Sequence, residues 1–164
     1  METYDAIRKR ASVREYQTKS VERAILEKLV DAGRRAPTAM GVEPWEFVVV
    51  TKPETVKGLG KAVTPCDFVQ TAAACIAVYC KETKYFLEDG CAATQNILLA
   101  AADIGLGACW IAGEREPWAK GINRTLKAPK DYHLVSMVAL GWPAKETEQV
   151  KNRSLENVIR WESW

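Results

Sequence analysis

The sequence has one histidine, no Cys-x-x-Cys pair and no apolar run long enough to span a bilayer. The most apolar stretch, residues 91–104, is interrupted by Gln95, Asn96 and Asp103, whereas a membrane helix needs about 20 consecutive apolar residues. The five cysteines lie within apolar stretches, which is typical of reduced, buried thiols. We therefore expect no membrane span, no disulfide framework and no metal site.

An excess of charge of one sign is also missing, because 23 basic residues balance 21 acidic ones to a net charge of +2. This balance argues against a general binder of nucleic acid or membrane surfaces, so any anion site must be local. The N-terminus is charged and leads directly into a helical pattern, so we expect no signal peptide and a cytoplasmic protein. The ordinary globular composition predicts a single domain over residues 1–164.

Apolar periodicity predicts helices and strands that alternate irregularly along the chain. Helical spacing occurs over residues 4–10, 20–35, 57–62, 91–104 and 114–126. Apolar runs predict strands near residues 46–51, 73–80, 108–112 and 135–141, with the second run at the sheet centre. Residues 129–134 are expected to form a loop, which would place His133 at the surface.

The pattern at residues 91–104 is apolar on nearly every face, so it predicts a core helix, an interface helix or both. Gly105 can adopt the left-handed conformation that ends a helix, and Gly107 permits a tight path into the next strand. The strand is expected to end at Ala112 and Gly113, where the small side chains leave the backbone accessible.

Two groups of cations are candidates for an anion site. Arg10, Ser12 and Arg14 alternate in an extended segment, so their side chains project to one side. Lys151 and Arg153 alternate in the same way near the C-terminus. Taken alone, the first group is more typical of a solvated basic patch.

Taken together and in order, the motifs resemble those of the nitroreductase family of FMN-dependent oxidoreductases along nearly the whole chain. An opening R-x-S-x-[RK]-x-[YF] is matched by Arg10, Ser12, Arg14 and Tyr16, and a P-S-S-x-N-x-Q-P-W loop is echoed at residues 37–45. The segment D-x-x-x-A-x-Q-N-x-x-L-A-A-x-x-x-G-L-G is matched by Asp89, Ala93, Gln95, Asn96, Leu99, Ala100, Gly105, Leu106 and Gly107. A closing G-[YW]-P is matched by Gly141, Trp142 and Pro143.

The resemblance implies an α+β fold, a three-layer α/β/α sandwich in which helices flank a mostly antiparallel central sheet. It also implies an intertwined homodimer, with the 91–104 helix at the interface and the C-terminal segment added as a strand to the partner's sheet. The loop at residues 37–41 would come from the second subunit and lie along the flavin ring.

The resemblance further implies an FMN site, in which both cation groups hold the phosphate and the backbone at Ala112 and Gly113 donates toward flavin N5. The residues expected to bind the cofactor are Arg10, Ala11, Ser12, Arg14, Pro37, Thr38, Ala39, Gly41, Ile111, Ala112, Gly113, Lys151 and Arg153. No side chain is expected to act as a catalytic acid or base, because NAD(P)H would deliver hydride to N5 and a small-molecule acceptor would then take it in ping-pong turnover.

The expected acceptors are nitro compounds, quinones or similar electron-poor molecules. Ala39, Gly41 and Glu43 differ from the family's loop motif, and little sequence is available for a lid, so we expect an open flavin site. Reductive dehalogenation or enoate reduction on the same scaffold, a flavin-binding sensor or storage protein, and a dimer without cofactor are the alternatives. Cys109 is interpreted as a buried structural cysteine.

Overall fold

Within residues 2–164, which the computed structural model describes, four strands form one sheet in the order β1-β2-β4-β3. All neighbouring strands are antiparallel. The strands are β1 (Trp45–Val50), β2 (Ala74–Lys81), β3 (Gly107–Ala112) and β4 (Tyr132–Gly141). The inner strands β2 and β4 are buried along nearly their whole length, which explains why their sequences are apolar on both faces.

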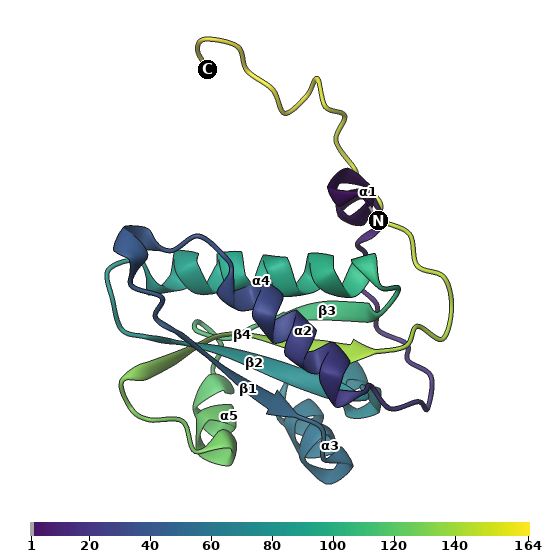
Figure 1. Ribbon diagram of the computed structural model, residues 1–164, viewed down its shortest axis with the longest axis vertical. Coiled ribbons are helices and arrows are strands. Elements are labelled where there is room, and N and C mark those ends of the chain that lie inside the picture. Colours follow the sequence, from purple (N-terminus) through teal and green to yellow (C-terminus); the bar gives the residue numbers. More distant parts are fainter. Residues whose placement is uncertain (1) are drawn as a thin grey trace.

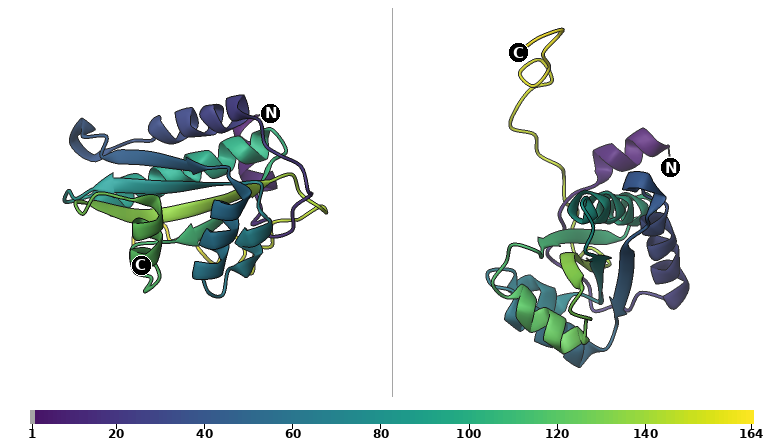
Figure 2. Two further views of the ribbon diagram at one scale, coloured as in Figure 1. Left: turned by 90° about the horizontal axis from the view of Figure 1, so that it is seen from below. Right: turned by 90° about the vertical axis from the view of Figure 1, so that its left-hand side faces the viewer.

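Helices cover both faces of this sheet (Figures 1 and 2). One layer contains α2 (Arg23–Arg34) and the long α4 (Phe86–Asp103), and the short α1 (Thr3–Lys9) packs beside the C-terminal end of α4. The other layer contains α3 (Pro53–Ala62), η2 (Asp67–Thr71) and α5 (Ala119–Leu126). A separate apolar cluster fills the space on each face of the sheet. The predicted three-layer α+β sandwich with an antiparallel sheet is therefore confirmed.

The helix α4 begins at Phe86, earlier than the predicted start at residue 91. Ile97 and Ala101 are fully buried against the sheet, but Gln95 is exposed and Leu99 is only partly buried. One side of this helix faces the core and another is partly exposed in the single chain, so the prediction of a core helix is confirmed and the prediction of an interface helix stays a prediction. None of the described helices combines the length and the apolar character that a bilayer crossing requires.

The segment between α1 and α2 crosses the ends of β3 and β4 and accounts for two motif glycines. A Cβ on Gly107 would lie 2.8 Å from Val13 Cγ1, and a Cβ on Gly141 would lie 2.7 Å from Tyr16 Cδ1. Both glycines therefore leave room for side chains of the crossing segment. The Tyr16 hydroxyl donates to the Val13 carbonyl at 2.7 Å, and burial raises the pKa of this phenol far above its usual value.

Two predicted boundaries require correction. The predicted loop at 129–134 is partly wrong, because β4 already begins at Tyr132 and therefore includes His133. The helix predicted to begin at residue 114 begins at Ala119, after a turn closed by a hydrogen bond from the Glu116 N–H to the Gly113 carbonyl at 3.0 Å.

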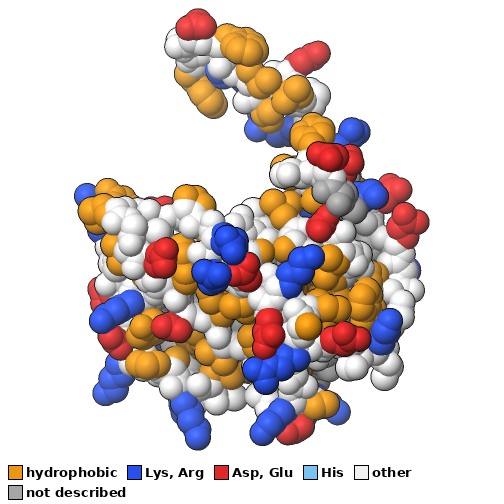
Figure 3. Space-filling model, viewed as in Figure 1, with side chains coloured by type: hydrophobic (Ala, Val, Ile, Leu, Met, Phe, Trp, Pro, Cys, Tyr) orange, Lys and Arg blue, Asp and Glu red, His pale blue; other side chains and the backbone are white. Residues whose placement is uncertain are grey.

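The C-terminal segment leaves the body of the molecule after β4. The Gln149 side chain donates to the Arg10 carbonyl at 2.8 Å, and beyond this contact the chain projects away from the layers (Figures 1 and 2). The projecting part carries exposed apolar side chains, including Leu155, Val158 and Trp161, which is 80% exposed (Figure 3). The pairing of this segment with a partner's sheet stays a prediction.

Candidate active site

The first cation group lies along the start of the edge strand β3. Ser12 forms a parallel bridge with Ala108, so the extended segment carrying Arg10, Ser12 and Arg14 runs beside this strand. The Arg14 guanidinium is exposed, 5.8 Å from the centre of the Phe68 ring, and donates to the Ser12 carbonyl at 3.4 Å. The prediction that these residues lie in extended chain is confirmed.

The cation group affects the pKa of Cys109 on β3. Burial raises the pKa of its thiol, while Arg14, a hydrogen bond with Ser12 and Arg10 act in the opposite direction. The net effect is a raised pKa, so Cys109 is a buried, protonated thiol, as its apolar sequence context predicts. Residue spacing does not indicate the neighbouring cation, because Arg14 is far from Cys109 along the chain.

The second cation group lies in a groove of about 1270 Å³ between α1, the C-terminal end of α4 and the segment after β4. Four predicted site residues line it: Arg10, Ala11, Lys151 and Arg153. Ser12 and Arg14 are not part of its wall. The two cation groups therefore meet at Arg10 without forming a single closed pocket.

The predicted small-residue loop is fixed to the first turn of α4 by Asp89, a residue that is 5% exposed. Its carboxylate accepts hydrogen bonds from the Thr38 hydroxyl and the Ala39 N–H, both at 3.0 Å. Thr38 in turn accepts the Glu43 N–H at 3.1 Å. Sequence reasoning assigned no role to Asp89, although an acidic residue at the start of an apolar helix was a visible signal.

The tip of this loop is the short helix η1 (Ala39–Gly41), and its backbone is unusual. Met40, Gly41 and Glu43 have φ angles of 57°, 67° and 49°. These values lie in the left-handed region, which residues other than glycine rarely adopt. The Met40 side chain is 82% exposed. The hydrogen bonds to Asp89 hold the start of the loop, but the Met40 side chain is exposed, so packing of that side chain does not account for its left-handed backbone.

The loop and the cation groups lie at opposite ends of α4 (Figure 1). Asp89 is in the first turn of the helix, whereas the groove is lined by Ala102 and Gly105 at its other end. An 18-residue helix is about 27 Å long, so one chain does not bring Pro37, Thr38, Ala39 and Gly41 to the cations.

The backbone at Ile111, Ala112 and Gly113 forms the other end of β3. Ile111 is buried and Ala112 is exposed. A Cβ on Gly113 would lie 2.2 Å from the Leu134 carbonyl oxygen. The contact with β4 therefore already requires glycine, whereas the sequence-based explanation invoked only the approach of a flavin.

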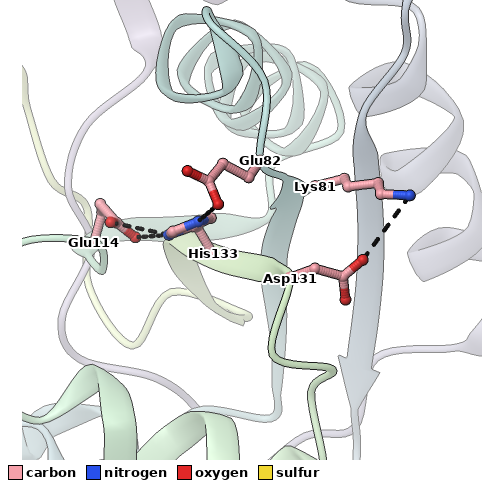
Figure 4. A network of polar contacts seen from close by, with 5 residues as sticks. All are labelled: Lys81, Glu82, Glu114, Asp131 and His133. Atoms are coloured by element: carbon pink, nitrogen blue, oxygen red, sulfur yellow. Dashed lines mark hydrogen bonds and ion pairs between the residues drawn. The ribbon is translucent and has the colours of Figure 1, made fainter.

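A group of charged side chains surrounds His133 beside this end of β3 (Figure 4). Its Nδ1 lies 3.1 Å from both carboxylate oxygens of Glu114, and its Nε2 lies 3.7 Å from Glu82. The imidazole also stacks on Phe86 with 4.6 Å between ring centres. The prediction of a surface histidine in a loop is wrong: the side chain is 28% exposed and is held on β4.

A family model described as Nitroreductase family matches residues 7–66 and 66–142. The chain belongs to the nitroreductase family. A protein of Methanothermobacter thermautotrophicus, provisionally named NADH dehydrogenase/NAD(P)H nitroreductase, is 33% identical over 151 residues, which cover 88% of this chain and 79% of that protein.

Two solved structures extend the comparison. A Parabacteroides distasonis protein with the same provisional name has a TM-score of 0.93 and 27% identity, covering 99% of this chain and 98% of that one. A provisionally named nitroreductase of Desulfovibrio desulfuricans, solved in complex with FMN, has a TM-score of 0.87 and 26% identity, covering 100% and 98%. The family resemblance inferred from the motifs is therefore confirmed.

Replacing Asp89 with alanine in this nitroreductase-family chain should release the loop from α4, because two hydrogen bonds lose their acceptor. We expect a folded protein destabilised by about 1–3 kcal/mol and exchange of the Ala39 amide hydrogen faster by about tenfold or more. Thr38→Val is the comparison variant: it removes the hydroxyl that binds both Asp89 and the Glu43 N–H but keeps the bond from the Ala39 N–H to Asp89, so the Ala39 amide should exchange more slowly than in Asp89→Ala. Equal exchange rates in wild type and Asp89→Ala would contradict the anchor.

Replacing Gly113 with valine should destabilise the protein even without any ligand, because the new Cβ overlaps the Leu134 carbonyl. Overpacking of this kind costs about 1–3 kcal/mol, measurable by chemical denaturation of the apo-protein. Gly121→Ala in α5 is the control, since nothing lies within 4 Å of its Cβ position. Full stability of Gly113→Val would show that β3 and β4 separate easily at this point.

Proposed function

We propose that this chain binds FMN along the outer edge of β3 and uses it to pass hydride from NAD(P)H to nitro compounds, quinones or similar electron-poor acceptors. One observation carries the proposal: the cation group lies at the start of the edge strand β3, and the exposed Ala112 lies at the other end of the same strand. Ala108 and Ala112 are about 13 Å apart at the rise of a β-strand. The FMN-bound relative and the names of the other relatives support this cofactor and this reductant.

The side chains at the start of β3 fit a phosphomonoester. Arg10, Ser12 and Arg14 combine two cations with a hydroxyl donor, and Lys151 and Arg153 lie in the groove that Arg10 also lines. Charge-assisted hydrogen bonds from such groups contribute about 1.5–3 kcal/mol each. In a chain of net charge +2, this local concentration of cations favours a dianion at this place.

The far end of β3 suits the flavin ring. When bound, FMN would supply the redox chemistry, accepting hydride at N5 and passing it to the acceptor. The chain would supply backbone donors at Ala112 and Gly113 and a small side chain at Ala112 that leaves the ring face open. The described residues form a bridge on this edge of β3 only at Ser12, which leaves the remainder of the edge available.

We further propose that the working form is a homodimer. The partly open side of α4 with Gln95 and Leu99 gives a second copy a surface to pack on. The exposed apolar tail, including Trp161, would gain cover from that copy. A second α4 packed antiparallel would bring the loop at residues 37–41 of one chain toward the cations of the other.

The purified protein should acquire flavin absorption bands on addition of FMN, and these bands should bleach when NADH or NADPH is added without oxygen. Bleaching followed by rapid reoxidation with a nitroaromatic or a quinone would support the proposed turnover. Tight FMN binding with slow turnover would favour a sensor or storage protein instead. Reoxidation only by halophenols or enones would favour the dehalogenase or enoate reductase alternative, and absence of FMN binding would contradict the proposal.

Replacing Arg14 with alanine should weaken FMN binding about tenfold to a hundredfold, the equivalent of one charge-assisted hydrogen bond. Arg153→Ala should act in the same direction, and both effects can be measured by titration of flavin fluorescence. Arg23→Ala is the control, because this exposed arginine pairs with Glu27 on α2. Unchanged affinity in both Arg14→Ala and Arg153→Ala would contradict the phosphate assignment.

A further inference from the structure

We propose that His133 is a positioning residue for the turn that follows β3. By holding the Glu114 carboxylate, its imidazole fixes the backbone at Ala112 and Gly113, against which the flavin ring is proposed to lie. This role rests on the proposed FMN-dependent function, and it assigns a task to the single histidine without making it a proton donor in the reaction.

The imidazole is held on three sides (Figure 4). Phe86, in the first turn of α4, stacks on it at an interplanar angle of 29°. Glu114 faces Nδ1 with both oxygens at 3.1 Å, and Glu82, which follows β2, faces Nε2 at 3.7 Å. The ring therefore connects the end of β2, the start of β4, the turn after β3 and the start of α4.

A β-bulge determines which way His133 points. The register of β2 and β4 shifts between Val78 and Tyr79, so Val135 is an extra residue in β4. Val135 and Ser136 both face α4, since Val135 lies where a Cβ of Gly90 would be and Ser136 is 2.7 Å from Thr94. Without the bulge, alternation would direct His133 to the opposite layer. Bulges commonly redirect a side chain beside a functional site.

The contact with Glu114 acts where the backbone pairing stops. The ladder between β3 and β4 ends at the pair Ala112 and Ser136. The chain then turns, with the Glu116 N–H donating to the Gly113 carbonyl at 3.0 Å. Beyond the packing of Gly113 on the Leu134 carbonyl, the side-chain contact between Glu114 and His133 is the next polar connection between the two segments, one residue past the backbone proposed to face flavin N5.

The strength of this connection depends on the protons that the imidazole carries. With both ring nitrogens protonated, Nδ1–H donates to Glu114 and Nε2–H faces Glu82. A ring nitrogen without a proton cannot donate, so the hydrogen bond to Glu114 requires a proton on Nδ1. The other charged groups nearby are Lys81 and Asp131, which pair with each other at 3.9 Å.

The residue opposite His133 on β2 and the ring stacked on it from α4 are both uncharged. Cys80 is opposite His133 on β2, and burial raises the pKa of its thiol to about 12, so it stays neutral. Phe86 contributes an uncharged ring from α4. The Nε2 atom itself is buried and has no hydrogen-bond partner among the described residues, and its 3.7 Å contact with Glu82 is an ion pair only when the imidazole is protonated.

The first test uses the protein without cofactor. The amide signals of Gly113 and Glu114 in two-dimensional NMR should move from their wild-type positions in His133→Phe, which keeps a ring to stack on Phe86, and in His133→Asn. Exchange of the Glu116 amide hydrogen should be about fivefold faster in both variants, because the turn has lost its support.

The second test uses the FMN-loaded protein. Both His133 variants should bind FMN within about twofold of wild type, since the phosphate is held at the other end of β3, but NADH should reduce their flavin about tenfold more slowly. Glu114→Gln, which keeps an acceptor oxygen, should retain more of the rate than Glu114→Ala.

Asp131→Asn is the matched control, because it removes a carboxylate beside the same cluster that pairs with Lys81 instead of His133. It should behave as wild type in every measurement. If His133→Phe fails to fold, Glu114→Ala tests the same contact from the turn.

Unchanged Glu116 exchange together with an unchanged flavin reduction rate in the His133 variants would overturn the positioning role and leave the FMN-dependent function standing. If the wild-type protein binds no FMN, the proposed function fails and the positioning role fails with it.

Discussion

The pairing of β2 with β4 is the constraint on which the rest of the structure depends, because these inner strands supply side chains to both apolar clusters. Ile76 and Val78 face the layer of α2 and α4, whereas Cys75 and Ala77 face the layer of α3 and α5. A slip of one residue in β2 would move all of these side chains to the opposite face. The register is therefore strongly fixed, and it determines where the outer strands β1 and β3 lie.

The bulge at Val135 is the one interruption of this inner pairing, and it occurs where the β3 ladder also ends. Its consequence is local: side chains of β4 before the bulge exchange faces relative to those after it. Leu134 then presents its carbonyl to Gly113, and His133 turns toward α4. The end of the edge strand that carries the candidate ring site is therefore shaped by a backbone irregularity inside the sheet.

The sequence predicted the four strands well and placed β2 in the sheet centre, because an apolar run such as that of β2 has few alternative environments. It failed at His133, since Pro129 and the polar residues after it resemble a loop and the bulge leaves no mark in residue type. The extended conformation of the segment with Arg10, Ser12 and Arg14 was predictable, because these polar residues alternate with others along the chain. The role of Asp89 was not predictable, because its partners Thr38 and Ala39 are distant in the sequence and only the folded chain brings them to α4.

The strained loop at residues 37–43 is an observation that supports the proposed homodimer. Met40 and Glu43 hold left-handed backbone conformations that cost energy in residues with a side chain, and a buried carboxylate is used to maintain them. Strain of this kind persists where surrounding contacts or a function require it, yet the Met40 side chain is largely exposed in its own chain. The cations that would hold a cofactor lie at the far end of α4, a helix about 27 Å long. A second copy with its α4 reversed would place a strained loop beside each set of cations, which gives both features a common reason.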